Sequence, residues 1–378
     1  IYARVNFAES LMQLLGTQGL SAQQNSAQLP NHQDIAQLLA KAVQDAKSLN
    51  DPRAESLALG SLGKLYEQTQ QLGEAQRLIQ QALNLSNSIN AADISYQWQW
   101  QLARVLTRKG EIENALSEAT RQSAIAANQQ AVDSLKSLRS DLVAMNPDVR
   151  FSFEEEIEPI YRHLVSLLLQ SPSQDNLKQA RSVIESLQLA ELDNFFRTAC
   201  LDAKAEQIDT VIEKSDAKAA VIYPIILPDR LAVIVSLPGQ PLRHYSTGLP
   251  QADVEEIIIE MRQAMSPALS NRERLRLSQN LYNWLIRPIE ASLAENSIKT
   301  LVFVPDGVLR NIPMAALYDG QQYLIEKYSV ALTPGLQLLE PRSLKQVHLH
   351  SLTGGLTEAR HGFSALPAVE AEVKQIST

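Results

Sequence analysis

The sequence is poor in cysteine, since Cys200 is the only one among its 378 residues. A single cysteine excludes an internal disulfide framework and any zinc site built on cysteine. Burial and hydrogen bonds must therefore hold the fold together. A reducing compartment is the simpler interpretation, and we expect a cytoplasmic protein.

Basic residues are fewer than acidic ones: the chain has 34 Lys and Arg and 42 Asp and Glu, which gives a formal net charge of −8. The basic residues are scattered and form no block, so a nucleic acid or an anionic lipid surface is not an expected partner. The longest apolar stretch, Ala219–Leu227, is too short to span a membrane and contains Pro224. No signal peptide is visible, although a chain that starts at Ile1 without Met leaves an upstream targeting signal open.

Aromatic residues are few, at 5%, whereas apolar residues make up 45% of the chain and charged residues 20%. This composition indicates a globular protein rather than a disordered one, and it suits helices that pack through Ala and Leu. The length favours two or three domains. No metal and no cofactor is indicated.

The first half of the chain contains two copies of a helix-turn-helix pattern. In the first copy, Leu59, Leu62-Gly63 and Tyr66 share one helical face, and Ala75, Ile79 and Ala82 share the facing one; in the second, Leu102-Ala103 and Leu106 precede a turn at Gly110, followed by Ala115 and Ala119. Small residues at these positions allow close helix packing. The period is about 40 residues. A degenerate tetratricopeptide array is predicted, with a plain helical bundle as the alternative.

Helical patterns continue through Phe151–Gln170 and from about Asp175 to Cys200, and the composition then changes. The polar stretch Asp202–Lys218 predicts a linker, so we place a domain boundary near Asp209. Beyond it, two apolar runs joined by Pro228-Asp229 predict a hairpin, Leu242–Thr247 a third strand, Val254–Met265 and Arg272–Leu293 two helices, and Thr300–Val304 a buried strand.

Four segments carry a family resemblance: KTLVFVPDGVLRNIPMAAL (Lys299–Leu317), Tyr323–Leu339, Ser351–Val373 and, upstream, Leu187–Ala203. They resemble the CHAT domain, a caspase- and separase-like domain that commonly follows tetratricopeptide repeats. The resemblance implies a fold of class α plus α/β. Residues 1–208 would form an all-α tetratricopeptide-like solenoid, and residues 209–378 the N-terminal, incomplete part of the caspase-like domain.

Two residues suggest the nucleophile and base of such a peptidase, and we reject both. Cys200 follows Phe196 and Leu192 on the apolar face of a helix, where a buried thiol stays protonated and inert. His361 precedes Gly362, as the family's catalytic histidine precedes a glycine. It follows a polar stretch instead of an apolar strand. The resemblance implies that the catalytic His and Cys lie beyond Thr378.

The remaining candidates have simpler structural interpretations. His348 and His350 alternate along a possible strand without a third metal ligand, and His32, His163 and His244 are isolated. Glu154-Glu155-Glu156 suits a helix start, Asp306-Gly307 suits a turn that needs these residues for geometry alone, and Gly354-Gly355 lacks the Lys and Ser or Thr of a phosphate loop. We therefore assign no catalytic, cofactor-binding or metal-binding residue.

Two functions remain open. In the first, the chain is part of a tetratricopeptide–CHAT cysteine endopeptidase or regulator, inactive by itself and bound to a C-terminal catalytic segment. In the second, it is a non-enzymatic scaffold that binds a protein or peptide on its helical surface. We also expect the Thr300 strand and the faces of Val254–Leu293 to be incompletely covered.

Overall fold

The computed structural model describes residues 1–17, 30–112, 117–145, 156–196, 218–265, 271–333, 355–360, 362 and 364–376. The chain divides into a large compact unit, Ile1–Leu336, and a small one, Gln337–Thr378.

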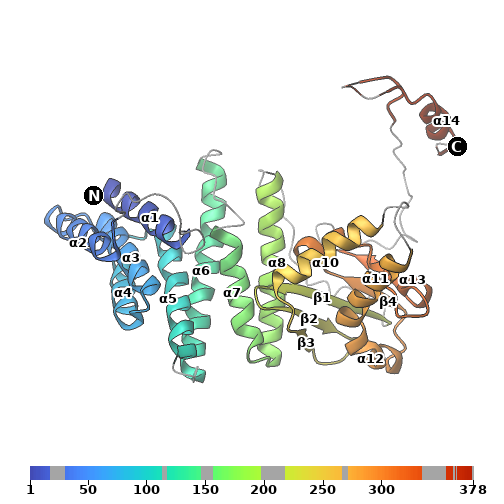
Figure 1. Ribbon diagram of the computed structural model, residues 1–378, viewed down its shortest axis with the longest axis horizontal. Helices are drawn as coiled ribbons and strands as arrows, with labels where there is room; N and C mark the ends of the chain where they lie inside the picture. The colour runs from blue at the N-terminus through green and yellow to red at the C-terminus, as the bar shows by residue number, and fades with distance from the viewer. Residues whose placement is uncertain are drawn as a thin grey trace. The chain divides into compact units, whose positions relative to one another are not determined.

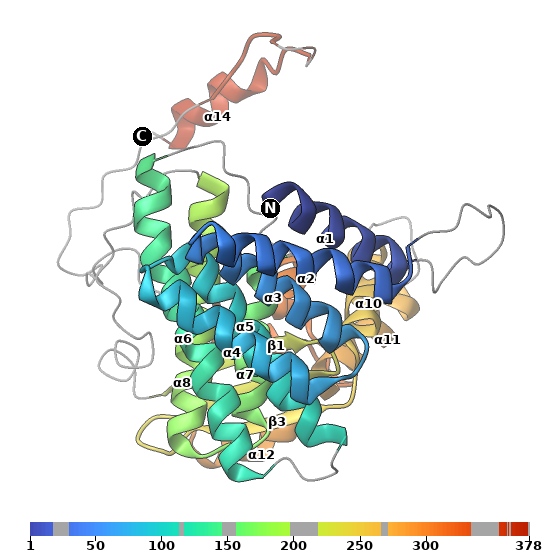
Figure 2. The same ribbon diagram turned by 90° about the vertical axis from the view of Figure 1, so that its left-hand side faces the viewer.

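The large unit begins with helices that lie side by side in chain order (Figures 1 and 2). Their bounds are α1 Tyr2–Thr17, α2 His32–Ser48, α3 Pro52–Gln68, α4 Leu72–Ser88, α5 Ala92–Ile112, α6 Glu118–Met145, α7 Glu158–Leu169 and α8 Gln174–Phe196. Each helix packs against its neighbours in sequence, which is the arrangement of a repeat array.

The turns between α2, α3, α4 and α5 are built alike. Asn50, Gln70 and Asn90 have positive φ values of 51°, 61° and 52°. In each turn the next residue donates its N–H to the carbonyl five residues back: Asp51 to Ala46, Gln71 to Tyr66 and Ala91 to Ser86. This is the Schellman termination of a helix. Because the turns recur at positions 50, 70 and 90, pairs of helices recur every 40 residues, and the helical region fits tetratricopeptide-like repeats as predicted.

Glycines let these helices approach closely. A Cβ at Gly63 would lie 2.8 Å from Ile79 on α4, and one at Gly60 would lie 2.3 Å from the Trp98 ring on α5. Trp98 also donates its indole N–H to the Ser56 hydroxyl over 3.1 Å. The predicted role of small residues in the first repeat is therefore confirmed.

Two predicted element boundaries were wrong. Gly110 is buried inside α5 and forms no turn, and the helix expected over Arg272–Leu293 is broken near Pro288, which lacks an N–H.

The second half of the large unit is a five-stranded sheet in the order β3-β2-β1-β4-β5. The strands are β1 Ala219–Leu227, β2 Arg230–Ser236, β3 Arg243–Thr247, β4 Thr300–Phe303 and β5 Ser329–Leu332. The first three form the predicted antiparallel hairpin and its third strand, while β4 and β5 run parallel to β1. The intervening helices are α10 Gln251–Ala264, α11 Asn271–Leu285, the 3-10 turn η3 Arg287–Ile289 and α12 Glu290–Glu295; after β4 come the 3-10 turns η4 Gly307–Asn311 and η5 Met314–Ala316, and α13 Leu324–Lys327.

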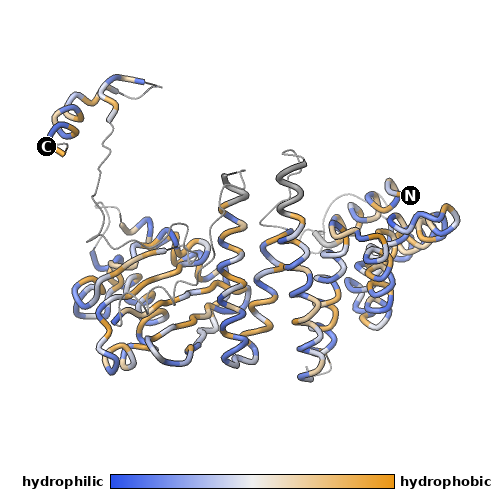
Figure 3. The backbone as a smooth tube through the Cα atoms, turned by 180° about the vertical axis from the view of Figure 1, so that it is seen from behind, coloured by the Kyte–Doolittle hydropathy of each residue, from blue (hydrophilic) through white to orange (hydrophobic). Residues whose placement is uncertain are grey.

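Side chains alternate between the two faces of the sheet, as the period of two of a strand requires. Along β1, Val221, Tyr223 and Ile225 join the core formed with α6, α7 and α8, whereas Ala220 and Ile222 join the core formed with α10, α11 and α12. The central strands are therefore apolar along their length (Figure 3). The last helices of the array thus form one of the layers that cover the sheet.

The domain boundary expected near residue 209 falls outside the described residues and stays a prediction.

The expectation of an uncovered Thr300 strand was wrong. Leu301, Val302 and Phe303 are buried, because β4 lies between β1 and β5 and is covered on both faces. The apolar faces of α10 and α11 are buried as well. Exposed apolar side chains in this half include Ile259 on α10, Ile325 on α13 and Leu332 on the outer strand β5.

The small unit contains one described helix, α14 Ala368–Ile376. No residue of α14 is buried, although Val369 and Val373 lie against Gly355 of the same unit; Ile376 is exposed. Within the described ranges of the whole chain, no helix combines the length and apolar character that a membrane crossing requires.

Candidate functional site

The end of strand β4 is the place where the helical array holds the sheet. The parallel ladder between β1 and β4 ends where Val304 donates its N–H to the Ile222 carbonyl over 2.9 Å. Strand β1 continues to Leu227, so its last residues have no strand beside them on that edge. Their backbone groups need other partners, because a buried and unpaired N–H or C=O is costly.

Two residues of β1 solve this problem in different ways. Backbone groups alternate in direction along a strand, so those of Pro224 and Ile226 point to the same edge as those of Ile222. Pro224 has no N–H to satisfy. Ile226 donates its N–H to Asp306 Oδ2 over 2.9 Å and accepts a hydrogen bond from Arg162 Nη1 over 2.7 Å. The two side chains therefore take the place of a strand neighbour.

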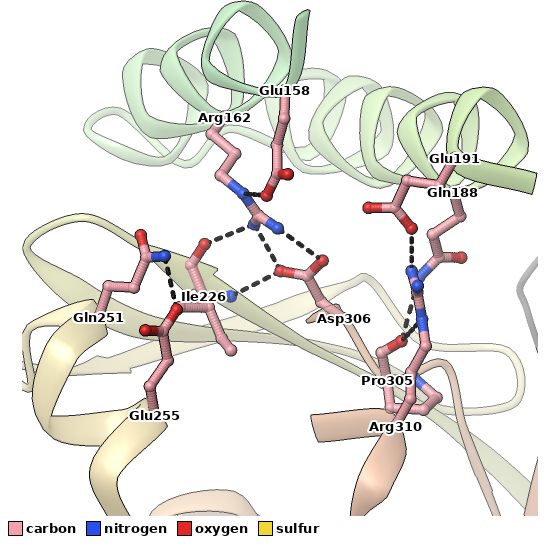
Figure 4. Close-up of polar contacts among 10 residues, drawn as sticks. All are labelled: Glu158, Arg162, Gln188, Glu191, Ile226, Gln251, Glu255, Pro305, Asp306 and Arg310. Atoms are coloured by element: carbon pink, nitrogen blue, oxygen red, sulfur yellow. Dashed lines mark hydrogen bonds and ion pairs between the residues drawn. The ribbon is translucent and has the colours of Figure 1, made fainter. Parts of the chain in front are cut away.

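Arg162 and Asp306 also bind each other directly (Figure 4). Nη1 and Nη2 of Arg162 donate to the two carboxylate oxygens of Asp306 over 2.6 Å and 3.1 Å. Glu158, one turn earlier on α7, accepts from Arg162 Nε over 2.5 Å. Asp306 is fully buried, and Arg162 nearly so. Burial opposes the charge of the guanidinium, but the Asp306 and Glu158 carboxylates outweigh it and raise the pKa of Arg162.

The neighbouring Pro305 carbonyl is held from α8. Gln188 Nε2 donates to it over 3.3 Å, and Arg310 Nε donates over 3.2 Å. Arg310 also pairs with Glu191 of α8, with 2.5 Å between Nη2 and Oε2. Burial raises the pKa of Glu191, and this ion pair opposes the rise. We call the whole set the junction: Glu158, Arg162, Gln188, Glu191, Ile226, Pro305, Asp306 and Arg310.

A groove of about 1260 Å³ opens beside the junction. Its walls come from α5, α7 and α8 on the side of the array, and from the β1–β2 turn, α10 and η4 on the side of the sheet. Junction residues Glu158, Arg162, Glu191 and Arg310 line it. A smaller hollow beside α1 and α2 also has Arg108 and Glu111 in its lining, so it lies next to this groove.

His163 lies in the wall of the groove and is held as a neutral imidazole. Asn128 Nδ2 lies 3.2 Å from its Nδ1, and Thr107 Oγ1 lies 3.5 Å from its Nε2. The Thr107 hydroxyl donates in turn to the Ala103 carbonyl. Burial, followed by the charge of Arg104, lowers the pKa of His163 to about 4. The interpretation of His163 as an isolated residue missed these contacts.

The expectation that Asp306-Gly307 serves turn geometry alone was wrong. Gly307 does adopt a positive φ of 49°, which favours glycine. The Asp306 side chain, however, faces the protein interior and binds Arg162. Only the apolar run that precedes Asp306 could have hinted at its burial, and nothing local identified its partner 144 residues earlier.

The other candidates are not brought together. Cys200, His348, His350, His361, Gly354 and Glu154-Glu155 lie outside the described residues. His32 and Glu156 are exposed, and His244 is half-buried on β3. Within the described ranges no cluster of His, Cys, Asp and Glu has the arrangement of a metal site.

Comparison with known proteins identifies a family for the C-terminal part of the chain, which contributes only the sheet side of the junction. The family model of the CHAT domain matches residues 275–378, which include Asp306 and Arg310 but not Arg162. The resemblance inferred from the sequence is thereby confirmed for this part of the chain. CHAT domains are a caspase-like, protease-related family.

No curated protein matches the chain. A solved structure titled "DHF58 filament" is 17% identical and covers 52% of this chain and 94% of its own, with a TM-score of 0.31. Similarity at this level establishes no relationship in fold.

Proposed function

We propose that this chain is the sensing and coupling part of a tetratricopeptide–CHAT protein. A protein segment binds in the groove, and the junction carries the effect of binding to the end of strand β4. The observation that supports this most is the pair Arg162–Asp306, which ties a helix of the array to the turn that follows strand β4 of the CHAT region.

The position of the groove gives further support. A segment bound there would contact Arg162, Glu158 and Arg310 directly, because these residues line the groove. Arg162 and Arg310 also hold the turn after β4, and Glu158 binds Arg162. A shift of any of them would change the hydrogen bonds of the Pro305 carbonyl and the Asp306 carboxylate. Binding and the geometry of the sheet are thus linked through side chains in direct contact.

The activity controlled in this way would be that of a cysteine endopeptidase. A thiolate nucleophile, a histidine as general acid and base, and backbone N–H groups as an oxyanion hole would perform it. We assign none of these groups to this chain, and we expect the chain by itself to have no peptidase activity. In the alternative function, a scaffold without chemistry, the same groove binds the partner.

Peptide display against the full chain tests the proposal. Peptides selected for binding should lose affinity for Val308→Arg, which places a bulky charge in the groove wall, and keep it for Ile259→Arg, which alters an exposed aliphatic side chain of α10 away from the groove. Bound peptide should also slow amide exchange in the segments that contain Ile226 and Val304.

Two results would contradict the proposal. Selected peptides that bind Val308→Arg as tightly as the wild type would place the partner elsewhere. Tight binding in the groove without any change of amide exchange at the end of β4 would contradict the proposed coupling. It would support the alternative function, a scaffold without chemistry.

A further inference from the structure

We propose that the groove selects an extended protein segment that carries Lys or Arg side chains. This inference rests on the groove being a partner site, as proposed above, and it adds the chemistry of the partner.

The cationic groups of the groove are already neutralised by carboxylates of the same chain. Four arginines line it: Arg104, Arg108, Arg162 and Arg310. Arg104 binds both oxygens of the buried Glu67 over 2.9 Å and 2.8 Å and stacks on the Trp100 ring. Arg108 lies 3.6 Å from the same carboxylate, and Arg162 and Arg310 belong to the junction. None of these guanidiniums is an unengaged site for an anion.

Two carboxylates of the groove have no such partner. Among the described residues, neither Glu111 nor Glu255 forms an ion pair. Glu255 accepts only a neutral hydrogen bond, from Gln251 Nε2 over 2.7 Å (Figure 4). Asp229 also lines the groove, but this exposed carboxylate pairs with its half-buried neighbour Arg230. The surplus charge of the groove is therefore negative and complements a cationic ligand.

The unpaired carboxylates stand on opposite walls. Glu111 is near the end of α5 in the array, whereas Glu255 is on α10 against the sheet. A ligand with cationic groups at two positions can pair with both and so bridge the array and the sheet. The ion pairs with the partner would then themselves link the array to the sheet.

The size and lining of the groove favour a protein segment over a small polycation. Its volume of about 1260 Å³ exceeds the ~300–1,000 Å³ of common small-molecule pockets. Apolar side chains, including Leu167, Leu192 and Val308, lie among the charged ones. Lys and Arg carry aliphatic stems that pack on such surfaces while the charged end reaches a carboxylate.

Fluorescence anisotropy with the full chain provides the test. The probes are three labelled extended peptides of Ser, Ala and Leu that differ only in carrying Lys, Gln or Glu at alternate positions, with unlabelled spermine as a competitor. The variants are Glu111→Gln, Glu255→Gln and their combination. Glu256→Gln is the matched control, because this exposed neighbour of Glu255 does not line the groove.

We expect the Lys peptide to bind, and added salt to weaken it. Each of the two groove variants should weaken it about two- to fivefold and the combination about tenfold, as expected for solvated ion pairs. The control should bind like the wild type.

Other outcomes overturn the inference in distinguishable ways. If the Gln or Glu peptide binds the groove as tightly as the Lys peptide, the cation preference fails while the proposed function survives. Spermine that competes as tightly as the Lys peptide would overturn the assignment to a protein segment. If the combined variant binds normally, the Lys peptide lies elsewhere. If none of the three peptides binds, this inference fails, and the peptides selected by display decide the proposed function separately.

Discussion

Arg162 and Asp306 lie 144 residues apart in the chain and form a two-bond ion pair, with 2.6 Å and 3.1 Å between donor and acceptor atoms. The pair also binds both backbone groups of Ile226. A helix of the array, the end of β1 and the turn after β4 therefore meet at two side chains.

Loss of one partner of the pair should destabilise the chain strongly. We expect Arg162→Met or Asp306→Leu to lower the free energy of unfolding by about 3–5 kcal/mol, because each leaves a buried charge and an Ile226 backbone group without a partner. Urea denaturation measures the loss. Glu158→Gln is the control, and it should cost about 1 kcal/mol or less, since that pair is partly solvated. The free energy of unfolding of the double variant should be only a little lower than that of the less stable single variant. Additive losses would show that the two residues act independently.

Acid should destabilise the fold through His163. Its pKa is lowered to about 4 in the folded chain, against about 6.5 when unfolded. Between these values the unfolded chain binds a proton that the folded chain does not, so stability falls as the pH drops from 6.5 to 4. The contribution is up to about 3 kcal/mol at the lower end. His163→Gln should reduce the pH dependence in this window, and the exposed His32→Gln should not. An NMR titration of His163 with a midpoint above 6 would contradict the prediction.

Two helix glycines should respond to alanine in opposite directions. At Gly60 the added methyl would lie 2.3 Å from the Trp98 ring, so Gly60→Ala should lower the melting temperature, at a cost of about 1–3 kcal/mol. At Gly73 no atom lies within 4 Å, so Gly73→Ala should raise stability by up to about 1 kcal/mol through helix propensity. Thermal unfolding of both variants checks this. Similar effects at the two sites would mean that the α3–α5 contact is loose.

The chain by itself should not hydrolyse peptides. Cys200, its only cysteine, follows an apolar helical pattern that predicts a protonated and unreactive thiol. A fluorogenic peptide library covering all residues at the cleaved position measures this activity. Turnover that disappears in Cys200→Ala would sink the prediction, whereas turnover that persists in that variant indicates a contaminating peptidase.

The sequence by itself determined the elements and their family. The spacing of Leu62 and Leu102 predicted the 40-residue repeat, because helix pairs of constant length return each residue type to the same face. Alternating and continuous apolar runs predicted the hairpin and the strand at Thr300, and the wording of Lys299–Leu317 indicated the CHAT domain. These signals are local, so they can be found without knowing where the elements go.

Only the tertiary structure decided how the two halves meet. An Arg in the middle of α7 and an Asp in a Pro-Asp-Gly turn have ordinary local explanations, a solvated helix face and a tight turn. Their roles arise because β1 runs past the end of β4 and leaves Ile226 without a strand neighbour, which is a property of the sheet register. The groove and its unpaired carboxylates likewise exist only because α5 and α10, distant in sequence, face each other across the junction.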